Sequence, residues 1–266
     1  MSTVRRRVER SPFPAAAIAA LAVALFALPL AGLLWRAPWS RARHVLASSD
    51  ALDALRLSLV TSTSATLVAL VLGVPLAWVQ ARVDYRGKSV VRALTTLPMV
   101  LPPVAGGVAL LLALGRNGIV GDQLDAAGVH LPFTTAGAVV AEAFVAMPFL
   151  VLTLEAAFRT SDRRLEDAAR TLGAHRFTVF RRVTLPLVRP SLVAGTVLCW
   201  ARALGEFGAT ITFAGNLPGV TQTLPLFVFI KFESTDADAA IVLSLVLVAI
   251  SVAVIVGLRD RWLVTR

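Results

Sequence analysis

Six long apolar segments constrain this chain more than any other feature of its sequence. They cover residues 15–35, 55–81, 93–114, 134–158, 191–213 and 239–258. A membrane-spanning helix needs about 20 mostly apolar residues, so each segment is long enough for one crossing. Since 57% of the residues are hydrophobic and only 16% are charged, the sequence predicts an all-α integral membrane protein with six transmembrane helices. Prolines within these segments, such as Pro102 and Pro103, are compatible with membrane helices when neighbours satisfy the freed carbonyls.

The basic residues fall mainly on one side of the expected membrane. The chain has 26 Lys and Arg against 16 Asp and Glu, a net charge of +10. If the N-terminus is inside, 19 of the 26 basic residues lie on the inner side, six lie outside, and Arg202 lies within a span. This positive-inside asymmetry predicts a multi-pass protein of the cytoplasmic membrane with both termini in the cytoplasm. Nucleic acid is not expected as a partner, because long apolar segments interrupt the basic residues.

The first apolar segment has two interpretations. Its basic start also fits a secretory signal peptide. However, the segment is longer than the usual apolar region of a signal peptide, and no clear cleavage site of small residues follows it. We therefore expect a retained helix, within an N-terminal unit (residues 1–54) of basic tail, first helix and external loop.

The longest polar segment, residues 159–190, has the pattern of two short amphipathic helices. Asp162 is a candidate N-cap, and Gly173 is a natural end for the first helix. The apolar residues between them recur at helical spacing: Leu165, Ala168, Ala169 and Leu172. A second helix is expected over residues 176–183, presenting Phe177, Phe180 and Val183 and ending before Leu185-Pro186. Periodicity alone fits either a helix lying on anionic lipid or one docking onto another protein.

The spacing within this segment resembles a motif of the permease subunits of binding-protein-dependent ABC importers. That motif reads E-A-A, three residues, G, nine residues, I, one residue, L-P. This chain has D-A-A at 167–169, then Gly173, then V-T-L-P at 183–186. Asp167 replaces the glutamate, although Glu166 stands beside it, and Val183 replaces the isoleucine. If Glu166 supplied the carboxylate instead, the helix register would change by about 100°.

The resemblance implies that this loop is a coupling helix that docks into a groove on a separate ATPase. The residues that match the motif, with Glu166, are Glu166, Asp167, Ala168, Ala169, Gly173, Val183, Leu185 and Pro186. The sequence contains no G-x-x-x-x-G-K-[ST] segment, so ATP and Mg²⁺ are expected on the partner ATPase. We expect this chain to hold no cofactor and to be a non-catalytic subunit. One coupling loop per chain implies two copies of this chain, or this chain with a related partner permease, together with two ATPase subunits.

The fifth apolar segment carries two charged residues at helical spacing. Arg202 and Glu206 are four residues apart, hence on one helix face. Because a charge within the membrane costs about 2.5–3.5 kcal/mol on insertion scales, each needs a partner or a wet cavity. The two residues either neutralise each other or line a pathway for an anion. Beside them, Ala201, Gly205 and Ala209 form a stripe of small residues that predicts close helix packing.

Two further segments resemble the permeases for tetrahedral oxyanions. These are R-A-L-G-E-F-G-A at 202–209 and F-A-G-N-L-P-G-V-T-Q-T-L-P-L at 213–226. Residues 221–226 and L-P-M-V-L-P-P at 97–103 look more like the molybdate and tungstate permeases than the sulfate ones. The resemblance implies a type I importer fold and a homodimer fed by an extracytoplasmic molybdate-binding protein. Residues 55–258 would be the core permease unit and 259–266 a cytoplasmic tail.

Hydroxyl groups on the second apolar segment suit either a passing dianion or helix–helix hydrogen bonds, and the second role is favoured. The candidate pathway residues are Thr61, Ser62, Thr63, Arg202 and Glu206. Glu142 and Glu155 would repel an anion, so we expect them to be paired or near an interface. The three histidines are scattered over three loops, which predicts no metal site.

Other functions remain as alternatives to molybdate import. Sulfate or thiosulfate import would use the same machinery. A secondary transporter or channel would need no ATPase, but that class usually has internal repeats, and none is convincing here. A membrane-embedded enzyme would need a reactive cluster, and the sequence suggests none.

Overall fold

The computed structural model describes residues 13–262, and the regular elements within that range are all helices. In chain order they are α1 (Phe13–Arg36), α2 (Trp39–Leu46), α3 (Ser49–Arg82), α4 (Lys88–Val100), α5 (Pro103–Leu114), α6 (Gly121–Ala126), α7 (Thr135–Thr160), α8 (Arg163–Thr171), α9 (Arg176–Val179), a π-helical turn (Phe180–Thr184), α10 (Leu185–Leu187), α11 (Arg189–Leu204), α12 (Gly208–Phe213), α13 (Leu224–Glu233) and α14 (Ala237–Trp262). The basic residues before position 13 and residues 263–266 of the expected tail lie outside the described residues.

Four of the six expected spans are continuous helices. The helices α1, α3, α7 and α14 are long and apolar enough to cross a membrane. The helix α11 is bent by 75° from the helical segment that precedes it, and only the two together are long and apolar enough for a fifth crossing. The shorter helix α5 is also apolar. The expectation of an all-helical, multi-pass membrane protein is therefore confirmed.

The third expected span, residues 93–114, is not one helix. It is divided into α4, which already begins at Lys88, and α5. The break lies at Leu101, whose backbone is extended (φ −63°, ψ 138°), and Pro102. A proline disfavours helical backbone at the residue before it and has no N–H to donate, so Pro102 and Pro103 end one helix and begin the next.

The fifth expected span, residues 191–213, is also broken. The helix α11 ends at Leu204, and α12 begins only at Gly208. The predicted packing stripe holds only at Ala209, which is buried, because Ala201 and Gly205 are exposed and Gly205 lies outside the helix.

The close approach of backbones lies instead between α12 and α5. A Cβ on Gly208 would be 2.7 Å from Cβ of Pro103, and a Cβ on Gly107 would be 2.8 Å from the carbonyl oxygen of Ala209. Since real Cβ contacts are never that short, these two positions admit only glycine without a shift of the backbone.

The core of the bundle lies between α3, α7 and α11, where small side chains allow close packing. Ala65, Ala69 and Ala77 of α3 and Ala146 of α7 are fully buried. Cys199 of α11 is buried in the same cluster, as expected for a small apolar residue. Because these three helices are closely packed against one another, a movement of one helix displaces the other two.

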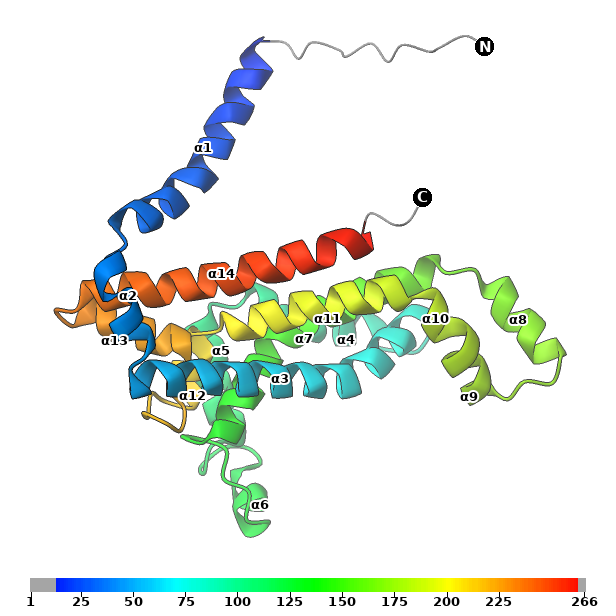
Figure 1. The fold of residues 1–266 in the computed structure, drawn as a ribbon. Helices are drawn as coiled ribbons and strands as arrows, with labels where there is room; N and C mark the ends of the chain where they lie inside the picture. Colours follow the sequence, from blue (N-terminus) through cyan, green and yellow to red (C-terminus); the bar gives the residue numbers. More distant parts are fainter. Residues whose placement is uncertain (1–12, 263–266) are drawn as a thin grey trace, which may run out of the picture.

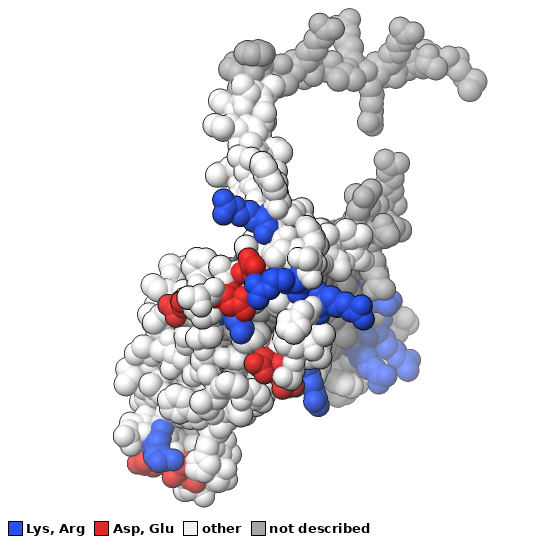
Figure 2. Space-filling model, turned by 60° about the vertical axis from the view of Figure 1, so that its left-hand side comes forward, with Lys and Arg blue, Asp and Glu red and all other residues white. Residues whose placement is uncertain are grey.

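The two ends of the bundle differ. Figure 1 shows α2 and α13 at one end, α8–α10 at the opposite end, and α1 standing away from the body. The apolar stretch of α1 contains no buried residue. Figure 2 shows that charged side chains gather at a few spots on the visible face, which is otherwise largely uncharged.

Candidate functional site

The first helix of the loop is built by local signals that the sequence displays. Asp162 caps α8, because its carboxylate accepts a hydrogen bond from the Arg164 N–H at 2.9 Å. Gly173 has φ +85°, which a glycine adopts without strain. Beyond it, the Ala174 N–H donates to the carbonyl oxygen of Ala169 at 3.0 Å, the bond typical of a Schellman C-cap. Both predicted boundaries of this helix are therefore confirmed.

The two neighbouring acidic residues of α8 point to different sides. Glu166 is buried, and its Oε1 lies 2.9 Å from Nη2 of Arg82 on α3. The Asp167 side chain is 67% exposed and lies 3.3 Å from Nη1 of Arg170. The outward position thus belongs to Asp167, which is the residue that matches the glutamate of the importer motif.

The apolar side of the loop is exposed. Leu172 is 88% exposed, Phe177 is 66% exposed and Leu165 is 49% exposed. Ala168 is exposed too, whereas Ala169 is half-buried. We call Leu165, Ala168, Leu172 and Phe177 the outer face; its exposed apolar surface is suited to contact with another molecule.

The second helix of the loop differs from the prediction. It does not end before Leu185-Pro186 but runs through α9, the π-helical turn and α10 as far as Leu187. Pro186 is the second residue of α10 and directly follows the π-helical turn, separated from it by Leu185 alone. The direction of the chain changes at Val188, where the 75° bend into α11 occurs.

The inner side of this segment contacts the bundle. Phe180 packs edge-on against Trp78 of α3, with ring centroids 6.3 Å apart. Val183 and Leu185 are half-buried, and Pro186 is exposed. Beside this contact lies a groove of about 580 Å³. Pro75 and Trp78 of α3 line one side of it, and residues of α8 and α9 line the other.

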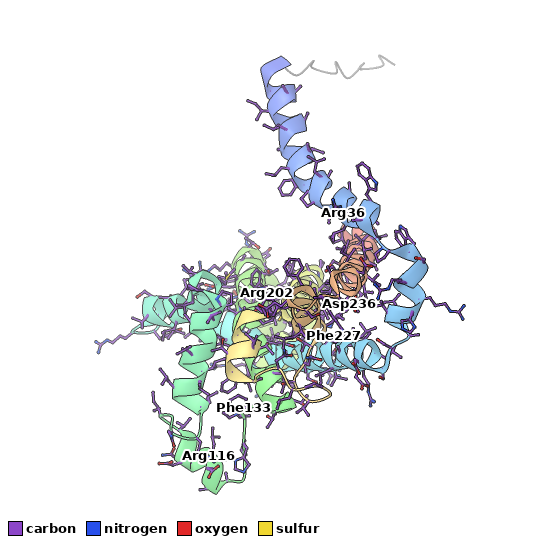
Figure 3. All side chains as sticks on the ribbon, turned by 90° about the vertical axis from the view of Figure 1, so that its left-hand side faces the viewer. Arg36, Arg116, Phe133, Arg202, Phe227 and Asp236 are labelled. Carbon is purple, nitrogen blue, oxygen red and sulfur yellow. The ribbon has the colours of Figure 1, made fainter. Side chains whose placement is uncertain are left out.

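The charged pair of the fifth span lies at the helix break. Arg202 Nη1 and Glu206 Oε2 are 2.6 Å apart, so the structure agrees with the first of the two alternatives, mutual neutralisation. The other oxygen of Glu206 accepts the Ala209 N–H at 2.8 Å and so caps the start of α12. Glu206 is 1% exposed, whereas the Arg202 side chain is 29% exposed. Figure 3 shows Arg202 in the middle of the helical body, far from Arg116 in the segment that projects around α6.

Two of the three candidate hydroxyls on α3 make helix–helix hydrogen bonds. Thr61 donates to Glu142 Oε1 at 2.8 Å, and Thr63 accepts from Trp200 Nε1 at 3.3 Å. Ser62 donates instead to the Leu59 carbonyl oxygen within its own helix, at 3.4 Å. The expectation that these hydroxyls make hydrogen bonds between helices is therefore confirmed for Thr61 and Thr63.

The two glutamates of the fourth span have different partners. Glu155 is paired with Arg92 and with Arg159, the latter at 2.8 Å, which confirms the expected pairing. Glu142 is 1% exposed, and its one hydrogen bond among the described residues comes from Thr61. Its partner is therefore a neutral hydroxyl rather than a cation.

Sequence reasoning missed two residues that organise this region. In the sequence, Arg82 is one of many basic residues assigned to the inner side. Its partner, Glu166, lies 84 positions away. Ser58 of α3 is buried and accepts the Leu224 N–H at 2.7 Å, which attaches residues 221–226 to the bundle. A pattern within one helix does not reveal contacts of such large sequence separation.

Comparison with known proteins gives concordant results. Residues 69–266 match the family described as "Binding-protein-dependent transport system inner membrane component". The chain is 47% identical to the molybdenum transport system permease protein ModB of Mycobacterium tuberculosis, over 79% of each chain. It is 44% identical to ModB of Escherichia coli, over 68% of this chain and 80% of that one.

Solved structures support the fold. A bacterial ABC transporter that imports alginate superposes with a TM-score of 0.73 over 95% of each chain, at 18% identity. The MetNI methionine ABC transporter superposes with a TM-score of 0.56, over 79% of this chain and 95% of that chain, at 17% identity. The fold is thus that of ABC importer permeases, and the chain belongs to the family of inner-membrane components of binding-protein-dependent transport systems.

Proposed function

We propose that this chain is the permease subunit of an ATP-driven ABC importer that moves molybdate, and tungstate as its close analogue, across the cytoplasmic membrane. The observation that carries this proposal is its 44–47% identity to molybdenum transport permeases, over most of both chains. The sulfate transport permease CysT of Salmonella typhimurium is more distant, at 34% identity over 79% of this chain. Sulfate or thiosulfate import is therefore the second candidate.

The working assembly contains two copies of this chain, two ATPase subunits and an extracytoplasmic molybdate-binding protein. The exposed apolar surface of α1 supports contact with a second copy or with membrane lipid. ATP and Mg²⁺ belong to the ATPases, and this chain contributes no catalytic group. A solved alginate importer in complex with its periplasmic protein provides a precedent for such an assembly.

The loop of residues 159–190 is the contact with the ATPase. Its outer face is apolar and exposed, and Asp167 is at its outward side. The end of the bundle that carries α8–α10 lies in the cytoplasm, as do both termini, in keeping with the strong excess of Lys and Arg assigned to that side. Residues 55–258 form the core permease unit.

Transport follows from rigid-body movement. Closure of the two ATPases moves the two loops and opens the pathway outward, and hydrolysis resets it. Arg202 and the hydroxyls of Thr61, Ser62 and Thr63 lie near this pathway. Because Glu206 lies 2.6 Å from Arg202 and neutralises it, this pair offers the anion little net charge. The affinity for the anion therefore resides mainly in the delivery protein.

Uptake by vesicles tests the assignment. Vesicles that contain this chain, its ATPase and the binding protein should accumulate labelled molybdate only with ATP, and excess sulfate should compete poorly. Strong competition by sulfate would favour the second candidate. ATP-independent uptake, or failure of an ATPase to co-purify, would instead favour a secondary transporter or channel.

Two variants test the role of the loop. Gly173→Asp and Ala169→Glu should leave insertion intact and ATP hydrolysis measurable, yet abolish ATP-dependent uptake. Normal uptake by both variants would refute docking of α8 onto the ATPase.

A further inference from the structure

The position of α8 depends on a buried ion pair. Arg82 is the last residue of α3, and its Nη2 donates hydrogen bonds to Glu166 Oε1 at 2.9 Å and to Ser161 Oγ at 2.7 Å. The side chains of Arg82 and Glu166 are only 6% and 7% exposed. Ser161 follows directly after α7. One guanidinium group therefore joins the ends of α3 and α7 to α8.

Apolar packing contributes little to holding α8 in place. Glu166 is the one buried residue of this helix, all of which lies in the described range. Leu165 is about half exposed, and the groove of about 580 Å³ lies between this segment and Pro75 and Trp78 of α3. The contact between Glu166 and Arg82 thus mainly determines how α8 is oriented and how far it lies from the end of α3.

The pair is a specific contact rather than one of several interchangeable ones. Arg82 Nε and Nη1 have no hydrogen-bond partner among the described residues, so Glu166 is the main counter-charge. Arg170 also approaches Glu166, but at 3.8 Å and with a side chain that is 50% exposed. Removing either buried charge leaves the other uncompensated, which is strongly unfavourable.

We propose that Arg82 and Glu166 form a mechanical joint that makes α3 follow α8 during each transport cycle. This inference rests on the proposed function, in which α8 is seated on an ATPase. The helix α3 runs over 34 residues with Pro75 within it, so Arg82 is joined to the bundle through one helix. The same helix holds Thr61, which is bonded to Glu142 on α7, beside the candidate pathway. Arg82 and Glu166 are positioning residues, since neither contacts the transported anion.

The first test measures coupling in the reconstituted complex of permease, ATPase and binding protein. Glu166→Gln and Arg82→Gln should each lower the molybdate moved per ATP hydrolysed at least tenfold, with the ATPase still bound. The matched control is Asp84→Asn, which removes the ion pair between Asp84 and Lys88. That pair also has a length of 2.9 Å, but Asp84 is exposed and lies just beyond α3. This variant should leave the ratio unchanged. Uptake and hydrolysis that fall in equal proportion in the Gln variants would refute the joint.

The second test replaces the charges by a covalent link. The double variant Arg82→Cys, Glu166→Cys should be uncoupled until a short bis-thiosulfonate reagent bridges the two thiols, and reduction should uncouple it again. Recovery of at least half the wild-type ratio would support a mechanical role. A bridged protein that stays as uncoupled as the single variants would overturn it.

A spectroscopic measurement separates this proposal from the proposed function. A spin label is attached to the Arg164→Cys variant, at the exposed start of α8. Its spectrum should show restricted motion when Glu166 is present and greater motion when Glu166→Gln is added. Unchanged motion would refute the joint even if molybdate uptake is normal. A wild-type complex that moves no molybdate with ATP would refute the proposed function, whatever the label reports.

Discussion

The helical body and the helix α8 are held in place by different kinds of contact. In the body, α3 and α7 meet through alanines such as Ala65 and Ala146, which have no exposed surface. In the loop, the one buried residue of α8 is the charged Glu166. Close packing resists displacement in every direction, whereas an ion pair fixes one point and one orientation. The body is therefore suited to move as a unit, whereas α8 is fixed mainly at one point.

The largest effect is expected where the body has no free space. Gly107→Leu would force side-chain atoms onto α12, because even a Cβ there would lie 2.6 Å from Cβ of Thr212. Overpacking in a tight core costs about 1–3 kcal/mol, and a clash with backbone costs more, so we expect no folded protein on size-exclusion chromatography.

The control for this prediction is Gly257→Leu on α14. A Cβ at Gly257 meets nothing within 4 Å, so this variant should be recovered at the wild-type level. Equal recovery of the two variants would show that α5 and α12 are not packed as closely as the body requires.

The same contrast explains what the sequence could predict. The caps at Asp162 and Gly173 were found because a helix end depends on residues within one turn of it. The break at Pro102 was missed, because apolar composition shows that a segment can lie in a membrane but not that its helix is continuous. The sequence also leaves open whether Glu166 or Asp167 faces outward, since that depends on Arg82, a partner in a distant helix.

The interior of the fifth span was predicted only in part. The spacing of Arg202 and Glu206 suggested a pair, and the pair exists. Its location at a break, with Glu206 capping α12, could not be inferred from a pattern that assumes an unbroken helix. The small-residue stripe holds only in part for the same reason, because Gly205 lies outside α11.

The next effect concerns the outer face of the loop. Leu172→Ser should hardly change folding, since the side chain is 88% exposed and surface substitutions cost at most about 0.5 kcal/mol. It should nevertheless lower ATPase co-purification and molybdate uptake at least tenfold, if this face is buried on the ATPase. Leu172→Met keeps the apolar surface and should bind and transport normally. Loss of function in both variants, or in neither, would contradict docking through apolar contact.

A smaller effect is expected from backbone strain at the end of α8. Gly173 and Gly87 both have φ +85° and open space around them, so alanine meets the same strain of about 1–2 kcal/mol at either position. Gly173→Ala should loosen the C-cap of α8 and lower uptake severalfold, as measured in vesicles. Gly87→Ala lies in the turn before α4 and should leave uptake unchanged. Equal losses would mean that strain alone, rather than the orientation of the loop, limits transport.

The smallest effect is expected at the exposed ion pair beyond α3, which contrasts with the buried pair at its end. A hydrogen bond from Lys88 holds the pKa of Asp84 below its usual range. A lowered pKa means that the pair stabilises the fold above the ordinary carboxyl pKa, and that this stabilisation is lost as the pH falls through the lowered value. Because Asp84 is fully exposed, water and salt screen the interaction, and Asp84→Asn should not measurably shift the thermal unfolding midpoint at neutral pH.

Glu166→Gln, measured in the same way, should lower that midpoint, since its partner Arg82 is buried. Equal midpoints for the two variants would show that burial does not distinguish the two ion pairs.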